Sequence, residues 1–285
     1  MQIARRLLTK MARRFVAGDN AEQALGAVER LNRSGIRATL DILGENVREQ
    51  DDAKRYVEGY RDLLQQIHAR QADANVSIKL TMLGLDIDTE LCRDNLLRVI
   101  EAAERTGNFV RIDMEGSAYT QRTLDLFYQV FEQHREVGAV IQSALRRSAG
   151  DIAELVRRGA RVRLCKGAYK EPPELAFTRK SEVCASFDRL AETLLREGRY
   201  PAIATHDDGR IRHALACAER HGIGKERFEL QMLYGLRART MQRLASEGYN
   251  TRIYVPFGTH WLPYFVRRLR ERKENVFFVL QNLFR

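Results

Sequence analysis

From residue 36 onwards the chain alternates short apolar runs with longer amphipathic stretches. The apolar runs are IRATLDIL (36–43), NVSIKL (75–80), FVRIDME (109–115), GAVIQSA (138–144), ARVRLCKG (160–167), PAIATH (201–206), FELQML (228–233) and TRIYVPF (251–257). Between them, stretches such as DNLLRVIEAAERTG repeat their apolar positions with the period of a helix. Glycines at the ends of several stretches (Gly107, Gly159, Gly198 and Gly248) predict left-handed helix caps.

Strands that each lead into a helical segment predict a parallel sheet, because parallel neighbours need a crossover connection. Eight such units in a chain of 285 residues predict an α/β protein with a (β/α)8 TIM-like barrel. A doubly wound open sheet usually has fewer strands and often a glycine-rich first turn, and no G-x-G-x-x-G occurs here. We therefore expect an N-terminal helical segment over residues 1–35 and a catalytic barrel over residues 36–285.

The N-terminal stretch MQIARRLLTKMARRFVAG has the pattern of a basic amphipathic helix. Ile3, Leu7, Met11 and Phe15 recur every four residues, and the stretch contains no acidic residue. The pattern predicts a helix that covers one end of the barrel, or a helix attracted to anionic lipid. Organellar targeting peptides share this composition.

The formal net charge of +10 favours anionic partners, which include nucleic acid, acidic lipid and anionic small molecules. The chain shows neither a helix-turn-helix pattern nor the aromatic clusters of nucleic-acid-binding modules, so we predict no nucleic acid partner. No apolar stretch is long enough to span a membrane, which predicts a cytoplasmic protein. The scattered Cys92, Cys165, Cys184 and Cys217 predict reduced thiols, and the histidine spacings predict no metal.

Polar and charged side chains gather at the C-terminal ends of the predicted strands, where barrel enzymes place their active sites. They are Lys79, Asp113, Glu115, Gln142, Arg163, Lys166, His206, Asp207, Gln231 and Tyr254. A charge buried without a partner costs several kcal/mol, so an internal ion-pair network is the alternative to a functional site.

The excess of cations among these residues predicts a ligand with a carboxylate or phosphate group. Arg267 and Arg268 follow the last strand on a predicted helix, and Glu271 lies close enough to pair with them. Tyr169, Tyr254 and Tyr264 add aromatic walls. The residues alone leave three classes open: an enzyme for a small anion, a Schiff-base or pyridoxal-phosphate enzyme that uses Lys79 or Lys166, and a basic RNA- or lipid-binding protein.

Two long motifs resemble those of the proline dehydrogenase family. RLCKGAYKE (163–171) is similar to the family's R-L-x-K-G-A-Y, and IYVPFGTHWLPYFVRRLRE (253–271) resembles its Y-x-P-x-G-T…Y-x-x-R-R-x-x-E ending. IKLT (78–81), IDME (112–115) and ATHD (204–207) match shorter family motifs. The resemblance implies a barrel whose last helix lies over its mouth. It also implies FAD bound without a Rossmann domain, and oxidation of L-proline to Δ1-pyrroline-5-carboxylate by hydride transfer to flavin N5.

The resemblance further implies a role for each candidate residue. Asp113 and Arg163 are the expected catalytic residues; Asp113 lies beneath the substrate and Arg163 beside flavin N5. The expected substrate-binding residues are Lys79, Leu164, Tyr169, Tyr254, Tyr264, Arg267, Arg268 and Glu271. The expected FAD contacts are Met114, Gln142, Arg163, Lys166, Gly167, Ala168, Thr205, His206 and Gln231.

The same resemblance implies partners. A membrane quinone would accept the electrons, and a separate pyrroline-5-carboxylate dehydrogenase would consume the product. Peripheral association with the inner face of the cell membrane would then bring the flavin close to its acceptor.

Overall fold

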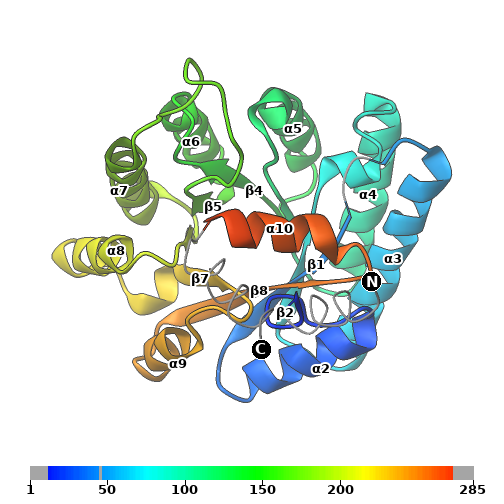
Figure 1. Cartoon of the computed structure of the whole chain (residues 1–285), viewed down its shortest axis with the longest axis horizontal. Coiled ribbons are helices and arrows are strands. Elements are labelled where there is room, and N and C mark those ends of the chain that lie inside the picture. The colour runs from blue at the N-terminus through cyan, green and yellow to red at the C-terminus, as the bar shows by residue number, and fades with distance from the viewer. Residues whose placement is uncertain (1–11, 45–46, 272–285) are drawn as a thin grey trace, which may run out of the picture.

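The computed structural model describes residues 12–44 and 47–271, and the side chains of residues 267–271 lie outside the described part. Eight parallel strands form a closed barrel in chain order (Figure 1). The strands are β1 (Arg37–Ile42), β2 (Ala74–Ile78), β3 (Val110–Ile112), β4 (Val137–Gln142), β5 (Arg161–Cys165), β6 (Ala202–Ala204), β7 (Glu229–Leu233) and β8 (Asn250–Phe257). β8 closes the barrel against β1, with Tyr254 opposite Thr39. The predicted (β/α)8 fold is confirmed.

Helices surround the barrel, with one exception. They are α2 (Ala21–Asn32), α3 (Gln50–Ala69), α4 (Thr89–Arg105), α5 (Ser117–Phe131), α6 (Ser148–Arg157), α7 (Lys180–Glu197), α8 (Asp208–Arg220), α9 (Ala238–Ser246) and α10 (Trp261–Glu271), with the short 3-10 helices η1 (Leu80–Leu83) and η2 (Lys225–Arg227). The exception is α10, which crosses the mouth of the barrel instead of packing on its outside (Figure 1). α2 packs against β1 and β8 in its place. No helix in the described ranges is both long and apolar enough to cross a bilayer.

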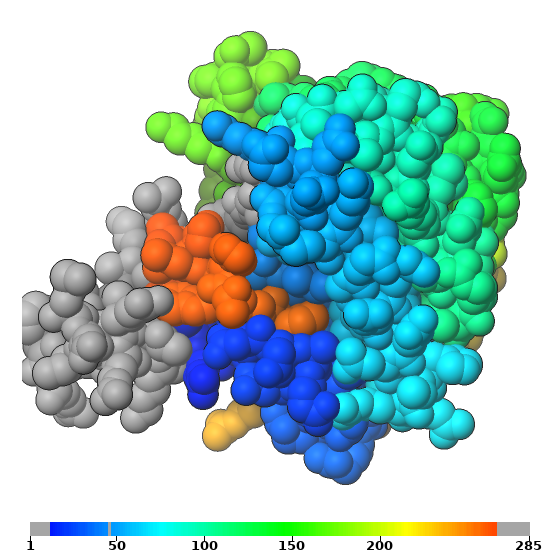
Figure 2. All heavy atoms as spheres, turned by 90° about the vertical axis from the view of Figure 1, so that its right-hand side faces the viewer, coloured from blue at the N-terminus to red at the C-terminus, as the bar shows by residue number. Residues whose placement is uncertain are grey.

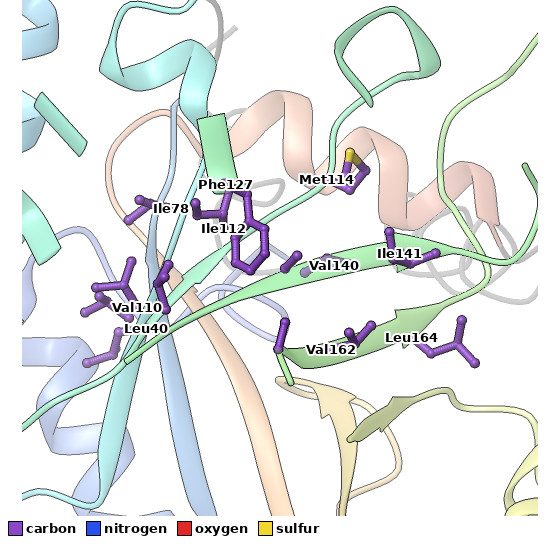
Figure 3. Packing of buried hydrophobic residues seen from close by; sticks show 14 of the residues in the cluster. Leu40, Ile78, Val110, Ile112, Met114, Phe127, Val140, Ile141, Val162 and Leu164 are labelled. Carbon is purple, nitrogen blue, oxygen red and sulfur yellow. The ribbon is translucent and has the colours of Figure 1, made fainter. Parts of the chain in front are cut away.

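Side chains alternate between the two faces of each strand, and this separates the apolar core from a polar interior. Leu40, Val110 and Val162 belong to the main hydrophobic cluster between the strands and the outer helices (Figure 3). Thr39 and Asp41 flank Leu40 on the opposite face. The ordinary barrel interior is filled with Val, Ile and Leu, so a polar interior indicates a use other than packing.

The N-terminal helical prediction is only partly correct. α2 is confirmed, but residues 13–15 form a turn, residues 16–18 are irregular, and residues 1–11 lie outside the described part. The backbone N–H of Ala17 donates to Pro256 O, and the Gly258 N–H donates to Gly18 O. These bonds tie the segment to the end of β8. Gly18 has a φ of 126°, which breaks the helix there because few other residues adopt it. The domain boundary at residue 35 stays a prediction.

A second hydrophobic cluster fastens α10 to the barrel mouth. It consists of Ala12, Phe15, Val16, Leu43, Tyr264 and Phe265. The rings of Phe15 and Phe265 lie 6.1 Å apart, and both side chains are buried. Figure 2 shows α10 in orange beside the N-terminal residues in dark blue, at the same end of the molecule. The segment before α2 therefore covers one end of the barrel.

Most of the predicted glycine caps are confirmed. Gly107, Gly159 and Gly248 have φ values of 63°, 71° and 85°, as a left-handed cap requires. Gly198 was expected to do the same but is extended, with φ −80° and ψ 155°. A Cβ atom at Gly198 would lie 2.5 Å from Leu194 O, so close backbone approach, not handedness, requires glycine here.

Candidate active site

The Asp113 carboxylate organises the barrel mouth beneath α10. Its Oδ1 accepts hydrogen bonds from Ser77 Oγ at 2.6 Å and from Arg163 Nη1 at 2.8 Å. Its Oδ2 accepts one from the Tyr254 hydroxyl at 2.7 Å. Ser77, Arg163 and Tyr254 come from β2, β5 and β8, so these bonds cross the barrel interior. We call these four residues, with Lys79 and Asp41, the Asp113 cluster.

Asp41 and Ser77 are members of the cluster that the sequence analysis did not list as candidates. The Lys79 ammonium donates to Asp41 Oδ1 at 2.8 Å and lies 4.0 Å from Asp113 Oδ2. Burial lowers the pKa of Lys79, but Asp41 and Asp113 outweigh it and raise that pKa above its ordinary value. Lys79 therefore stays protonated. This disfavours the Schiff-base alternative for Lys79, because a nucleophilic lysine needs a lowered pKa.

Tyr254 is fixed as a hydrogen-bond donor. Burial raises the pKa of its hydroxyl well above the ordinary value, and the Asp113 carboxylate raises it further. The Arg163 guanidinium lies over the Tyr254 ring, 5.4 Å from its centroid. Tyr254, Arg163 and Asp113 therefore hold one another in a single arrangement.

The Arg163 guanidinium has donors to spare. The Arg163 side chain is 6% exposed, and its Nε and Nη2 have no hydrogen-bond partner among the described residues. Leaving a buried donor unpaired costs roughly 1–3 kcal/mol. A ligand that accepts hydrogen bonds beside Arg163 would remove that cost.

A second group of candidate residues lies along the ends of β4 to β7. Lys166 Nζ donates to Asp207 Oδ2 at 2.6 Å, and the Leu233 N–H donates to His206 Nε2 at 2.9 Å. A Cβ atom at Gly167 would lie 3.0 Å from Gln142 Oε1, so the chain passes close to Gln142 there. The N–H of Thr205 donates to Gln231 O. Six of the nine expected cofactor contacts thus lie at or near the ends of β4 to β7.

The remaining candidates are not among the six residues of the Asp113 cluster. Leu164 and Met114 are in the main hydrophobic core (Figure 3), and Leu164 faces away from Arg163 because the two are neighbours in β5. Tyr264 is buried in the cluster beneath α10. Tyr169 is close enough to raise the Lys79 pKa, and Ala168 is exposed. Arg267, Arg268 and Glu271 stand on α10, with side chains outside the described part.

The opposite end of the barrel interior holds a buried ion pair between residues that the sequence analysis did not list as candidates. Arg252 Nε lies 3.0 Å from both oxygens of Glu229, and Gln231 donates to the same carboxylate. Burial lowers the pKa of Arg111 well below its ordinary value, and the Arg163 charge lowers it further. A cavity of about 440 Å³ opens at this end, lined by residues such as Asp73 and Phe109. It lies at the opposite end of the strands from the Asp113 cluster.

The Lys166–Asp207 pair makes stability depend on pH. The hydrogen bond from Lys166 lowers the pKa of Asp207 from 3.8 to about 2. The folded state thus holds this carboxylate ionised below its unfolded pKa, and the pair's contribution is lost as pH falls from about 4 towards 2. We expect Lys166→Met to lower the free energy of unfolding at pH 5, and the deficit to shrink by about pH 3, as measured by urea titration. Lys225→Met is the control: the Lys225 ammonium donates to the Glu247 carbonyl and lies 4.6 Å from the centroid of the Tyr249 ring. Neither partner is a carboxylate, so this variant should show a pH-independent effect between about pH 5 and pH 3.

Comparison with known proteins gives consistent matches. A family model described as "Proline dehydrogenase" matches residues 24–281. The chain is 41% identical over 272 residues to "Proline dehydrogenase 1" of Bacillus subtilis (strain 168), covering 95% of this chain and 90% of that protein. It is 38% identical over 287 residues to "Proline dehydrogenase" of Deinococcus radiodurans, covering 99% and 93%.

Solved structures agree with this. The structure of proline utilization A from Bdellovibrio bacteriovorus, inactivated by N-propargylglycine, superposes with a TM-score of 0.85 at 28% identity. The match covers 92% of this chain and 32% of that one, so the chain spans about a third of the solved structure's length.

Proposed function

Because the chain belongs to the proline dehydrogenase family, an oxidoreductase family of proline catabolism, we propose that it oxidises L-proline to Δ1-pyrroline-5-carboxylate with FAD as its resident cofactor. The single observation that carries the proposal is the Asp113 cluster at the mouth of the barrel, beneath a helix that carries two adjacent arginines. Bound FAD would supply the hydride acceptor at its N5 atom.

The described residues fit a flavin at this position. Arg163 offers two buried guanidinium nitrogens without partners among the described residues, and these suit the acceptor atoms of a flavin ring. A guanidinium beside N5 would stabilise the negative charge that develops on reduction. Asp113 holds that guanidinium in place from the other side. Lys166, Gln142, Thr205 and their neighbours on β4 to β7 would hold the rest of the cofactor.

The residues of β1, β2 and β8 would hold the proline. Lys79 has three donor hydrogens and directs one to Asp41, so others are available for the substrate carboxylate. α10 brings the positions of Arg267 and Arg268 to the same mouth, where both would bind that carboxylate. Tyr254 would form a wall against the ring. These contacts would keep the reacting carbon close to the hydride acceptor and exclude water.

The visible absorption spectrum of the purified protein, recorded before and after anaerobic addition of L-proline, tests the function. We expect flavin bands that bleach on addition of proline and persist with D-proline. A flavin spectrum that ignores L-proline would refute the substrate assignment. A colourless protein that does not take up added FAD would refute the cofactor. If borohydride inactivates the protein only in the presence of a carbonyl substrate, the lysine-based alternative is supported instead.

We also propose that the electrons pass to a membrane quinone, that the protein associates peripherally with the cytoplasmic face, and that a separate dehydrogenase consumes the product. The basic residues Arg5, Arg6 and Lys10 support membrane association. Each basic residue contributes about 1 kcal/mol at an anionic surface. Replacing all three by glutamine should therefore weaken co-sedimentation with anionic vesicles on the order of a hundredfold. Equal sedimentation of the two proteins would exclude this attachment.

Phe15 is expected to affect proline binding without touching the site. Phe15→Ala removes the aromatic contact that fastens α10, and truncating a buried phenylalanine costs about 3–5 kcal/mol of packing. We expect the KM for proline to rise on the order of tenfold, with a smaller change in kcat. Phe228→Ala is the matched control, because Phe228 is buried with its ring 6.1 Å from Tyr249, away from α10. Equal KM changes in the two variants would show that α10 docking does not govern binding.

A further inference from the structure

Three potential metal ligands meet between α7 and α8. They are Glu192, Cys217 and His221, and the ligand atoms all lie within 4.8 Å of one another. Cys217 and His221 are four residues apart, at the end of α8, and the His221 N–H donates to Cys217 O. Glu192 comes from α7, which packs along α8. The sequence spacing alone did not indicate this group, because only the packing of α7 against α8 brings the Glu192 carboxylate to Cys217 and His221.

We propose that Glu192, Cys217 and His221 bind a Zn²⁺ ion. A thiolate, an imidazole and a carboxylate are the ligand types that zinc takes, and three protein ligands leave one position for water. His221 Nε2 lies 3.5 Å from Glu192 Oε1. Two ligands at zinc distances of about 2.0–2.1 Å and a tetrahedral angle are separated by about 3.3 Å. This pair therefore has nearly the required separation.

The exposure of the three residues suits a metal site at the surface. The His221 and Glu192 side chains are 31% and 34% exposed, so an ion can enter from solvent. Cys217 forms the buried floor at 1% exposure. A thiolate and a carboxylate would neutralise both charges of the ion. A site with sulfur and nitrogen donors does not suit Mg²⁺ or Ca²⁺, because both ions take oxygen ligands.

The neighbouring cations set a limit on affinity. Arg196 Nη1 lies 3.9 Å from Glu192 Oε1 and competes for that carboxylate. The thiol proton must also leave for the metal to bind, so binding should strengthen as pH rises from about 6 to 8.

The site lies on the outer helices and none of its residues belongs to the Asp113 cluster. Its occupation is therefore expected to stabilise the α7–α8 pair rather than alter proline oxidation directly.

Cobalt and zinc binding to the holoenzyme test the site. Titration of the metal-free holoenzyme with Co²⁺ should give one equivalent of a thiolate-to-cobalt charge-transfer band, read as a difference spectrum so that other chromophores cancel. X-ray absorption at the zinc edge should show one sulfur at about 2.3 Å and nitrogen or oxygen ligands at about 2.0–2.1 Å. Zn²⁺ should also raise the melting temperature.

Variants identify the ligands. Cys217→Ser should abolish the charge-transfer band. His221→Gln should weaken binding at least about tenfold, because losing even a residue that supports a ligand costs about 10–100-fold in metal affinity. His134→Gln is the matched control, because His134 pairs with Glu104 at 2.9 Å. Absence of the band in the parent protein, or zinc without a sulfur ligand, would overturn the proposal. So would binding that His221→Gln leaves unchanged.

Discussion

Asp113→Asn is expected to lower kcat/KM for proline by about a thousandfold while the protein still folds. Arg163, Ser77 and Tyr254 all donate to the two oxygens of Asp113. Asparagine offers one acceptor oxygen and no charge, so it cannot accept from both sides of the group. Breaking a buried pair costs about 3–5 kcal/mol, and each 1.36 kcal/mol is tenfold in rate when the loss falls on the transition state. Steady-state kinetics with proline measures the effect.

Glu229→Gln is the matched control for this prediction. Glu229 is also a buried carboxylate paired with an arginine, Arg252, but it lies in the lower half of the barrel. Both variants should lose thermal stability, and the Glu229 variant should retain kcat/KM within about tenfold. If Asp113→Asn also stays within tenfold of the parent, the carboxylate is not needed to hold Arg163 and Tyr254.

The fold was predictable because the barrel repeats one simple pattern. Each strand is an apolar run in the sequence, and each crossover has the period of a helix. Errors of one or two residues in the predicted ends of these elements do not change the topology. Residues such as Asp113 and Arg163 were recognisable as site candidates because they interrupt an apolar run near its C-terminal end. Asp41 and Ser77 interrupt their runs in the same way. Those interruptions, in IRATLDIL and NVSIKL, were the available signal.

Pairings across the barrel could not be predicted from single strands. Arg252, Glu229 and Arg111 lie in separate strands, and only the closed barrel brings them into one network. The non-helical conformation of residues 13–18 was missed for a similar reason. Local periodicity favours a helix there, but hydrogen bonds to β8, more than two hundred residues later, decide the conformation. Tertiary contacts override local preference where the backbone has partners elsewhere.

The position of α2 explains why α10 can lie over the proposed active site. A helix after β8 would ordinarily cover the outside of β8 and β1. α2 covers that surface, so α10 is available to lie over the mouth. The same N-terminal segment supplies Phe15, which fastens α10. The segment from Phe15 to the end of α2 therefore has two roles: α2 occupies the outer surface of β8 and β1, and Phe15 packs against the helix that carries Arg267 and Arg268.

Arg163→Met is expected to slow flavin reduction by proline by about a thousandfold or more and to lower the flavin midpoint potential. Methionine has similar length but no charge, so it supplies neither the hydrogen-bond donors nor the cation. Removing one donor that stabilises developing negative charge costs about 10²–10³ in rate, and here the Asp113 carboxylate also loses its partner. A buried carboxylate left without its cation would disfavour further negative charge nearby. For a two-electron couple about 30 mV corresponds to 1.4 kcal/mol, so we expect a shift on the order of −60 mV.

Arg163→Lys and Arg252→Met separate the causes of that effect. Lysine keeps the charge but lacks the planar fork, so Arg163→Lys should restore much of the potential while the reduction rate stays at least about tenfold low. Arg252→Met removes a buried arginine from the other end of the barrel and should destabilise the protein without moving the potential. Anaerobic stopped-flow reduction and redox titration of the flavin-loaded variants measure both quantities. A normal potential and rate in Arg163→Met would place the reacting atoms away from Arg163, and the spare nitrogens of its guanidinium would then need another partner.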